Sequence, residues 1–415
     1  MTNEVTQKTT SNEQNVSSSN GLEPLLRFCE FKGNLPQVKL SELFHKCTQK
    51  NRNGAINNVI CNSAKNGLIP QRDFFDKDIA NSENTTGYYI IKNNDFVYNP
   101  RKSNEAPYGP VSIYKDAEDG IVSPLYLCFR ATAPLCAEYF EMYFKSPAWH
   151  RYVYLMGDSG ARHDRVSIKD EVFFDMPVRI PSLSEQQKIA DFLFLVDQRI
   201  EKQRQLVESL KKYKRGLLYL FFVAKVPNKK LSELIRLGKA GGTPLSSNPN
   251  YYNGKIPFLS ISDMTKQGKY LYYTDKYISD EGLNNSAAWL VPINSLIISM
   301  YASYGLVAIN KIELSTSQAL FSIIPHDPLD IEFLYYYLSY LSSTGYYDKM
   351  VSTGTQPNLN AEKIKNIPIY IPLDKKEKEN ICNVLLTFED SEEKAQKMLF
   401  YLQQLKNSLL QQMFI

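Results

Sequence analysis

The 415-residue sequence lacks an apolar stretch that could cross a membrane. Its longest uninterrupted apolar run, residues 217–224, falls far short of the ~20 residues that a transmembrane helix requires. The polar residues 1–8 have neither the apolar core of a signal peptide nor the Arg-rich pattern of a transit peptide. The 6 cysteines form no CxxC pair, which disfavours zinc ribbons and redox motifs. These absences predict a protein of the reducing cytoplasm that makes no contact with a membrane.

The motifs of common catalytic sites are also missing. There is no GxxxxGK[ST] phosphate loop and no HExxH or paired-cysteine metal motif, and the 4 histidines are dispersed. The Asp/Asn-Pro-Pro-Tyr loop of amino-methyltransferases is absent, and residues 98–101 (Tyr-Asn-Pro-Arg) come nearest to it. Glu-Glu-Lys at residues 392–394 has the spacing of a nuclease ExK motif but falls inside a predicted helix, where charge clusters are usually solvated. We therefore expect no catalytic residue, no metal and no cofactor.

The composition permits nucleic-acid binding without requiring it. There are 48 Lys and Arg residues against 44 Asp and Glu, and a net charge of +4 is too small to indicate a polyanionic partner by itself. Tyrosine is abundant, with 28 residues against 2 Trp, and exposed tyrosines suit polar recognition surfaces. With 43% hydrophobic and 22% charged residues, the chain is typical of a folded protein of about two or three domains.

An internal repeat organises the chain. Lys-Leu-Ser-Glu-Leu at residues 39–43 returns at residues 230–234, and Ile-Pro at residues 180–181 returns at 371–372, so both motifs recur after 191 residues. The repeat predicts the following segments: a disordered tail (1–21), a first globular domain (22–181), a first spacer helix (182–224), a second globular domain (225–372) and a second spacer helix (373–415).

Each Ile-Pro pair is followed by a coiled-coil pattern. Apolar residues recur at alternating steps of four and three, and from residue 185 to 222 such a helix would be about 55 Å long. Lys214 and Lys406 interrupt the two patterns at matching positions, and Glu392 stands where the first helix has Ile200. The expected pairing residues are Ile189, Leu193, Val196, Ile200, Val207, Leu210, Leu217, Ile381, Leu385, Phe388, Leu399, Leu402 and Leu409.

The matched patterns favour a pairing of the two helices with each other over two helices of an ordinary bundle, since a globular domain separates them. A chain that must pass through that domain pairs them antiparallel, with the globular parts at opposite ends, as in a dumbbell. Within the globular parts, short β-rich runs at residues 87–91, 95–98, 295–300 and 305–309 precede amphipathic helices. The predicted fold class is α/β (mixed α+β), with two globular domains in tandem repeat and two long antiparallel coiled-coil helices.

Candidate DNA-binding residues lie in the loops, which differ between the two repeats. Arginine can read guanine and asparagine or glutamine adenine through paired hydrogen bonds, while lysine holds phosphates. For any single residue, an ordinary surface or turn role is as compatible with the sequence. The candidates are Tyr98, Asn99, Arg101, Lys102, Tyr108, Arg162, His163, Arg165, Gly242, Thr243, Ser262, Tyr301, Ser303, Tyr304, Gln318, Thr355, Gln356 and Asn358.

The order of several short motifs resembles the specificity (S) subunit of type I DNA restriction-modification systems. The motifs are Gly-Gly-Thr-Pro (241–244), Tyr-Tyr-Asn-Gly-Lys-Ile-Pro (251–257), Ser-Ala (286–287), Ser-Met-Tyr-Ala (299–302) and Thr-Gln-Pro-Asn-Leu-Asn (355–360), together with Tyr-Asn-Pro-Arg (98–101) and Val-Ser-Pro-Leu-Tyr (122–126) in the first domain. The Ile-Pro pairs that lead into helices resemble the family's conserved spacers. The resemblance extends over about residues 22–415.

The resemblance implies a subunit without catalytic activity, in which each domain recognises one half of a split site in double-stranded DNA and the helices set the spacing. It also implies two methyltransferase (M) subunits docked on the helices and restriction (R) subunits as further partners. Three alternatives stay open: the recognition subunit of a related system without a separate translocase, a fused DNA methyltransferase or nuclease, and a structural coiled-coil adaptor.

Overall fold

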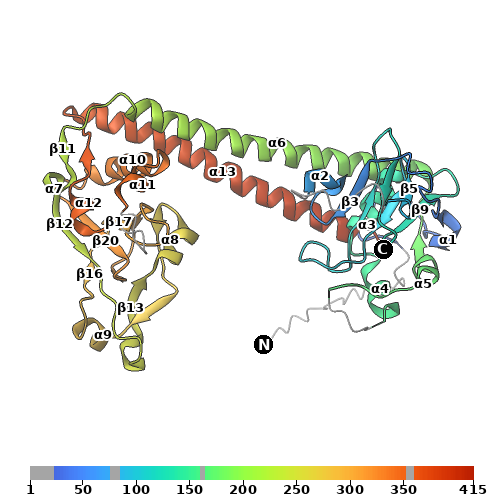
Figure 1. Ribbon diagram of the computed structural model, residues 1–415, viewed down its shortest axis with the longest axis horizontal. Coiled ribbons are helices and arrows are strands. Elements are labelled where there is room, and N and C mark those ends of the chain that lie inside the picture. The colour runs from blue at the N-terminus through green and yellow to red at the C-terminus, as the bar shows by residue number, and fades with distance from the viewer. Residues whose placement is uncertain (1–22, 75–84, 159–163, 352–358) are drawn as a thin grey trace, which may run out of the picture. The chain divides into compact units, whose positions relative to one another are not determined.

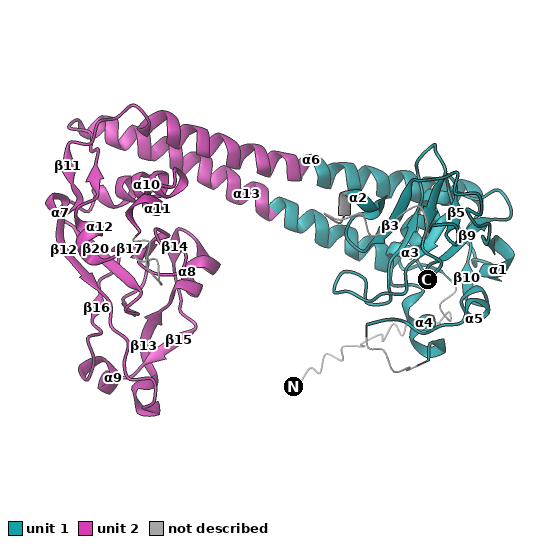
Figure 2. Ribbon diagram, in the orientation of Figure 1, with its two compact units in different colours: residues 1–202, 398–415 teal, residues 203–397 magenta. Residues whose placement is uncertain are grey.

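The computed structural model describes residues 23–74, 85–158, 164–351 and 359–415, so the predicted tail, residues 1–21, lies outside the described residues (Figure 1). The chain divides into two compact units. The first contains residues 1–202 and 398–415, and the second contains residues 203–397 (Figure 2). Each unit holds one globular domain together with part of each of two long helices, α6 (Leu183–Phe222) and α13 (Lys375–Met413).

The first unit contains a domain of two four-stranded sheets, in the orders β2-β9-β6-β7 and β4-β3-β8-β5, plus the pair β1-β10. Its remaining elements are β1 (Gln37–Lys39), α1 (Leu40–Leu43), β2 (Phe44–Lys46), β3 (Val59–Ser63), β4 (Gly67–Pro70), α2 (Gln71–Phe74), β5 (Tyr89–Ile91), β6 (Phe96–Tyr98), β7 (Val111–Ile113), β8 (Gly120–Val122), β9 (Leu127–Ala131), α3 (Ala137–Lys145), α4 (His150–Met156), α5 (Asp170–Phe174) and β10 (Pro177–Arg179).

The second unit contains a five-stranded sheet, β12-β20-β17-β18-β14, a four-stranded sheet, β15-β13-β19-β16, and the pair β11-β21. Its remaining elements are β11 (Lys229–Lys230), α7 (Leu231–Leu234), β12 (Ile235–Ala240), the 3-10 helix η1 (Pro249–Tyr251), β13 (Tyr252–Leu259), α8 (Ile261–Gln267), β14 (Tyr270–Leu271), β15 (Lys276–Ile278), α9 (Asp280–Asn284), β16 (Leu290–Val291), β17 (Leu296–Ser299), β18 (Val307–Asn310), β19 (Leu314–Thr316), β20 (Leu320–Pro325), α10 (Asp330–Ser343), α11 (Tyr346–Met350), α12 (Ala361–Lys365) and β21 (Pro368–Ile369).

The two domains share one strand topology. The order β2-β9-β6-β7 corresponds to β12-β20-β17-β18, and all pairs within both are antiparallel. The order β4-β3-β8-β5 corresponds to β15-β13-β19-β16, and in both the central pair is parallel while the outer pairs are antiparallel. The predicted mixed α/β class and the tandem repeat are therefore confirmed.

Each domain core continues onto the long helices. In the first unit, Phe44, Phe96 and Phe129 pack with ring centroids 5.3–5.4 Å apart, in a cluster that also contains Leu193 of α6 and Leu409 of α13. In the second unit, the corresponding cluster contains Leu218 and Phe222 of α6 with Leu385 of α13. Each fully buried side chain of this size contributes about 1.5–3 kcal/mol of hydrophobic stabilisation.

The two helices run antiparallel within each unit. In the first unit, Lys406 forms an ion pair with Asp197. In the second, Gln203 Nε2 donates to the carbonyl oxygen of Ala395 over 2.9 Å, and Lys214 Nζ lies 3.0 Å from Glu389 Oε1. As the residue number rises along α6 it falls along α13, which is the predicted direction.

All thirteen predicted pairing residues are buried or half-buried. Glu392, the charged residue at a seam position of α13, is half-buried. Its Oε2 lies 3.6 Å from Lys214 Nζ on α6, so its charge is paired. The same 192-residue offset relates Lys214 to Lys406 and Glu389 to Asp197, so one interhelical ion pair occurs twice in the repeat. Such polar pairs in an apolar seam fix its register. The location of the globular parts at opposite ends stays a prediction.

Candidate nucleic-acid interface

In the first domain, a surface hollow of about 530 Å³ brings together cations from two segments. The loop after β6 contributes Arg101 and Lys102, and the chain before α5 contributes Arg165. Backbone hydrogen bonds hold the segments side by side, from Lys102 N to Asp164 O over 2.9 Å and from Val166 N to Pro100 O over 2.8 Å. The grouping of these candidate cations is therefore a property of the folded backbone.

The charges around this hollow favour an anion. Lys65 adds a fourth cation to its lining, and Glu105 is the acidic residue among the lining side chains. Arg101 and Lys102 are exposed, while Arg165 is half-buried, with Nε 3.9 Å from Asp164 Oδ2. Exposed guanidinium and ammonium groups in one hollow suit contacts with DNA phosphates and with guanine edges.

Asn99 holds the loop that presents Arg101. Its side-chain amide donates to the carbonyl oxygen of Asn62 over 3.0 Å, and its Oδ1 accepts the backbone N–H of Arg101 at 3.1 Å. Gly109 closes the same loop with a φ of +84°, and a Cβ at this position would lie 2.2 Å from the carbonyl oxygen of Asn99. Asn99 therefore shapes the loop through local hydrogen bonds, and glycine is required opposite it.

Tyr98 is a core residue, so its assignment to a DNA contact is wrong. Its side chain is 2% exposed, its ring stacks on Phe173 with centroids 5.0 Å apart, and its hydroxyl donates to the carbonyl oxygen of Tyr108 over 2.9 Å. Burial raises the pKa of the Tyr98 phenol well above its usual value. The ring of Tyr108 is half-buried and packs 4.7 Å from that of His150.

Gly242, in the second domain, is also not available to a ligand, because it is buried where two backbone segments meet. A Cβ at this position would lie 2.3 Å from the carbonyl carbon of Ala287, and its N–H donates to the carbonyl oxygen of Thr316 over 3.0 Å. Only glycine permits so close an approach. The neighbouring Thr243 is exposed, and its hydroxyl accepts the backbone N–H of Gln318 at 3.3 Å.

Backbone hydrogen bonds gather the other second-domain candidates at one end of the sheets. Ser317 N donates to Leu259 O over 3.0 Å, which places the β19–β20 turn beside the start of α8. Met300 N donates to Ala319 O over 2.8 Å, which brings the loop after β17 to the same turn. Exposed Ser262, Gln318 and Tyr301 belong to these segments, and exposed Thr243, which follows β12, is joined to the turn by its hydrogen bond with Gln318.

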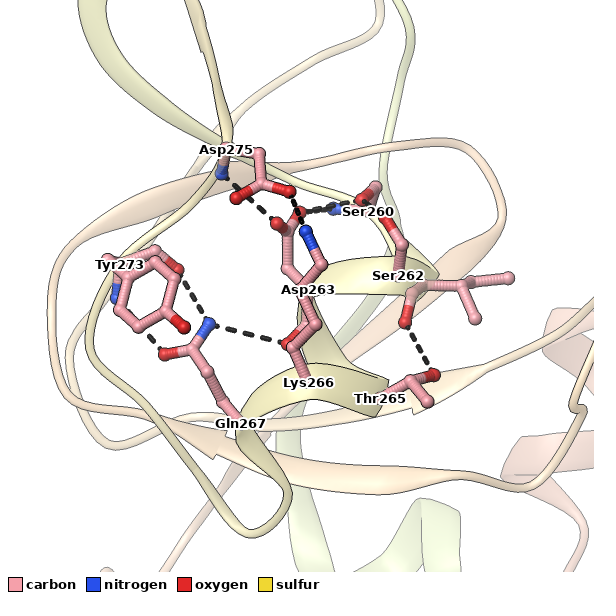
Figure 3. Close-up of polar contacts among 9 residues, drawn as sticks. Ser260, Ser262, Asp263, Thr265, Lys266, Gln267, Tyr273 and Asp275 are labelled. Atoms are coloured by element: carbon pink, nitrogen blue, oxygen red, sulfur yellow. Dashed lines mark hydrogen bonds and ion pairs between the residues drawn. The ribbon is translucent and has the colours of Figure 1, made fainter. Parts of the chain in front are cut away.

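Buried Asp263 organises the start of α8, where Ser262 is exposed (Figure 3). Its Oδ2 accepts the backbone N–H and the hydroxyl of Ser260 at 2.8 and 2.6 Å, and its Oδ1 accepts the N–H of Asp275 at 3.0 Å. The Ser260 and Ser262 hydroxyls lie 2.8 Å apart. A fully bonded buried carboxylate holds this corner rigid, so the position of Ser262 is fixed before any partner binds.

The loop after β17 is held in an unusual conformation. Ser303 has a φ of +58°, a left-handed conformation that is uncommon for residues other than glycine, and its carbonyl oxygen accepts the Ser299 hydroxyl at 2.6 Å. The Tyr304 hydroxyl donates to Asp348 Oδ1 over 2.6 Å, while Tyr301 is 40% exposed. Five further candidates lie outside the described residues: Arg162, His163, Thr355, Gln356 and Asn358.

The two candidate surfaces occupy equivalent places in the shared topology. In the first domain, the loop after β6 and the β8–β9 turn form the hollow. In the second, the loop after β17 and the β19–β20 turn meet, and these are the same connections of the same sheets. Residues 122–126 form one of the motifs named from the sequence, but none of the candidate DNA contacts falls in this turn or at Lys65. The equivalence of the turns is hard to find by alignment, because the offset between equivalent strands changes along the chain, from 200 residues at β6 and β17 to 193 at β9 and β20.

Neither a metal centre nor a membrane segment is found within the described ranges. There, no three or more His, Cys, Asp and Glu side chains are placed to hold a metal ion. Of the helices in the same ranges, none combines the length and the apolar character needed to cross a membrane.

The chain consists of two domains of one topology, each followed by a long helix, and the side chains at equivalent surface loops differ between the domains. These features define a binding protein with two related recognition units. Residues 37–212 and 225–399 match the family described as the type I restriction modification DNA specificity domain. The chain belongs to this family and carries its domain twice, so the resemblance in the sequence is confirmed.

Two curated relatives are specificity subunits of type I restriction enzymes. The HindI subunit of Haemophilus influenzae is 35% identical over 133 residues, which are 32% of this chain and 29% of that protein. The MjaIX subunit of Methanocaldococcus jannaschii is 26% identical over 199 residues, which are 46% of this chain and 45% of that protein. The chain thus matches less than half the length of both.

Solved structures share the fold over nearly the whole chain. The HsdS subunit from Thermoanaerobacter tengcongensis has a TM-score of 0.52 at 17% identity, covering 93% of this chain and 99% of that one. A chain from a structure on complex assembly and conformational transition of the type I R-M system has a TM-score of 0.62 at 16% identity, covering 91% and 98%. Identities this low establish likeness of fold alone.

Proposed function

We propose that this chain is the sequence-specific DNA-binding subunit of a type I restriction-modification complex. Residues 38–179 recognise one half of a bipartite site in double-stranded DNA, and residues 230–370 recognise the other half. The observation that carries the proposal is the equivalence of the two candidate surfaces, because the same connections present Arg101 and Lys102 in the first domain and Tyr301 and Gln318 in the second. Unlike side chains at equivalent loops suit two different half-site sequences.

The long helices are the proposed ruler and docking surface. Large apolar side chains are exposed on them outside the paired seam, and large exposed apolar groups on a helix suit burial by a protein partner. They are Leu183, Phe194, Leu195, Met398, Phe400, Tyr401 and Leu405 in the first unit, and Leu206, Tyr213, Tyr219, Leu220 and Val384 in the second. We propose that two methyltransferase subunits dock there, one for each repeat, and that restriction subunits join the complex through them.

The chain has no catalytic step of its own in this proposal. Methyl transfer and cleavage belong to the partner subunits, and the complex acts in the cytoplasm. The described candidates are cations, hydroxyls and amides that suit base and phosphate contacts, whereas a nucleophile and a paired general base are not among them.

Methylation mapping in cells tests this function. The chain is co-expressed with its methyltransferase partner in a host without other adenine methylation, and methylated adenines are located by sequencing. The expected result is one asymmetric motif of two short half-sites separated by a spacer of constant length. Methylation by this chain without the partner would show that it carries its own transferase activity, and a continuous motif would contradict the two-domain proposal.

The helix role has a separate test in the same assay. Four residues inserted after Gln203, with four more after Ala395, lengthen the pair by about 6 Å and just over one helical turn. The half-sites should then move apart by one or two base pairs, because B-DNA advances about 3.4 Å per base pair. An active variant with an unchanged spacer would show that the helices do not set the distance.

A further inference from the structure

We propose that Leu125 is a specificity-determining residue of the first domain, and that its side chain contacts the C5-methyl group of a thymine in the major groove of the first half-site. This inference rests on the proposed function and names one base contact within it. Leu125 lies in the turn between β8 and β9, and its side chain is 63% exposed.

Leu125 stands between the candidate DNA-binding groups of its domain. It lines the hollow of about 530 Å³ that also contains Arg101 and Lys102, and it lines a neighbouring hollow of about 430 Å³ that contains Lys46. Arg165 belongs to the lining of both. An exposed leucine is common on protein surfaces and needs no explanation when it stands alone. Here it is an exposed apolar side chain beside Arg101, Lys102 and Arg165, while Lys46 is ion-paired with Asp170 in the lining of the second hollow.

Local contacts hold the backbone of this turn in place. The Ser123 hydroxyl accepts the backbone N–H of Leu125 at 3.3 Å, and the Ser123 carbonyl oxygen accepts the N–H of Tyr126 at 3.0 Å. Pro124 has a fixed φ, and Tyr126 packs against the buried cluster around Val97. The backbone that carries Leu125 is therefore already ordered before a ligand binds, so no entropy is lost in ordering the turn.

The topology of the second domain supports a base contact at this place. The β8–β9 turn corresponds to the β19–β20 turn, where exposed Gln318 is a candidate reader of adenine. Leucine has no hydrogen-bonding group, so at the equivalent position it cannot read the donors and acceptors of a base edge. The apolar group that the major groove offers is the thymine methyl, which aliphatic side chains contact in DNA recognition. The equivalent turns would thus read different bases by different chemistry.

Methylation mapping of variants tests the contact with the full chain and its methyltransferase partner. Leu125→Ala should lose discrimination at one thymine of one half-site, with the other half-site and the spacer unchanged, and Leu125→Met should keep the original motif. Leu155→Ala is the matched control, because Leu155 is a 64% exposed leucine of the same domain, in α4, and lines neither hollow. A Leu125→Ala motif identical to that of the original chain overturns the inference.

A second arm does not depend on any variant. Each thymine of the mapped half-site is replaced by uracil in a duplex oligonucleotide, which removes only the methyl group, and binding of the assembled complex is measured. Loss of one buried methyl should weaken binding about fourfold at one position, and the effect should disappear with Leu125→Ala. If uracil weakens binding at none of the thymine positions, the inference is wrong. It is also wrong if Leu125→Ala removes a bend of the bound DNA and the loss does not depend on thymine, as expected of a side chain inserted between base pairs.

The outcomes separate this inference from the proposed function. If the original chain gives no bipartite motif, the proposed function fails, whatever Leu125 does. If the motif is bipartite and unaffected by the Leu125 and uracil changes, the proposed function stands and only the thymine contact is refuted.

Discussion

Replacing Lys269 by methionine tests how the second domain is fixed to the helices. The Lys269 ammonium lies 2.7 Å from Glu389 Oε2 on α13 and donates to the Tyr336 hydroxyl over 2.8 Å, and its side chain is 9% exposed. It also lies 2.8 Å from Glu332 Oε2 on α10, in an ion pair without hydrogen-bond geometry. Glu389 in turn pairs with Lys214 of α6, so the charges join the domain to both helices.

The expected loss is worked out from these contacts. Methionine keeps the aliphatic stem of Lys269 but leaves Glu389 and Glu332 without this cation. Breaking a buried ion pair by removing one partner costs about 3–5 kcal/mol. Because Lys214 remains beside Glu389, we expect a value near the lower end, about 3 kcal/mol, in the free energy of unfolding of the second unit. Lys276→Met is the control, since Lys276 is exposed in the same unit.

The stability lost in Lys269→Met should become smaller as the pH falls. Burial acts to raise the pKa of Glu389, but the nearby Lys269 and Lys214 charges outweigh it, so the pKa lies below the usual value. A carboxylate with a lowered folded-state pKa stabilises the fold above its unfolded pKa, and this stabilisation is lost as the pH falls through the folded value. The difference between the original chain and Lys269→Met should therefore be largest near neutral pH and shrink below about pH 4.

The two tryptophans allow the units to be followed separately. Trp149 lies in the first unit and Trp289 in the second, so 5-fluorotryptophan labelling gives one ¹⁹F resonance for each. In urea, Lys269→Met should move the Trp289 transition to lower denaturant and leave the Trp149 transition in place. An unchanged Trp289 transition, or a loss that grows as the pH falls, would refute the reasoning about this ion-pair network.

Three further predictions concern the seam, a close backbone contact and the cationic hollow. Leu385→Ala, at a fully buried seam position, should cost about 2–5 kcal/mol in urea unfolding, whereas Leu220→Ala, at a 70% exposed position, should cost less than about 0.5 kcal/mol; equal losses would contradict the seam. Gly242→Ala should lower the melting temperature, because the added methyl group meets backbone atoms 2.3 Å away. Gly216→Ala in α6 adds a methyl group that meets nothing within 4 Å and should stabilise the protein by about 1 kcal/mol. Both are measured by calorimetry, and an unchanged melting temperature of Gly242→Ala would contradict the close contact. Arg165→Gln should weaken DNA binding and reduce the slope of log affinity against log salt by about 1 if the side chain contacts a phosphate; an unchanged slope in a salt titration would exclude that contact.

The helix pair could be predicted from the sequence because its pattern is local and repeated. The four-three spacing identifies the buried face of each helix without knowledge of the rest of the fold, and the common offset of Lys214 and Lys406 gives the register. In the same way, the short apolar runs at residues 87–91, 95–98, 295–300 and 305–309 overlap with β5, β6, β17 and β18. These are properties of residues close together in the chain.

The recognition surfaces were less predictable because they depend on contacts between distant segments. Gln318 and Thr243 are joined by a hydrogen bond across 75 residues. The neighbouring Asn-Pro-Arg makes Tyr98 a candidate DNA contact, although the β6 strand buries it. The Gly-Gly-Thr-Pro motif makes Gly242 a candidate too, although it serves a close backbone contact. Leu125 has no recognition chemistry visible in the sequence, and its place among cations follows only from the fold.

The central claim is that each domain reads one half-site independently, and a domain replacement tests it most directly. Residues 230–370 are replaced by the corresponding domain of a relative with a different known motif, the chain is co-expressed with its methyltransferase partner, and methylated adenines are sequenced. The account predicts that one half-site changes to that of the donor while the other half-site is retained. A motif that changes in both halves, or in neither, would contradict it.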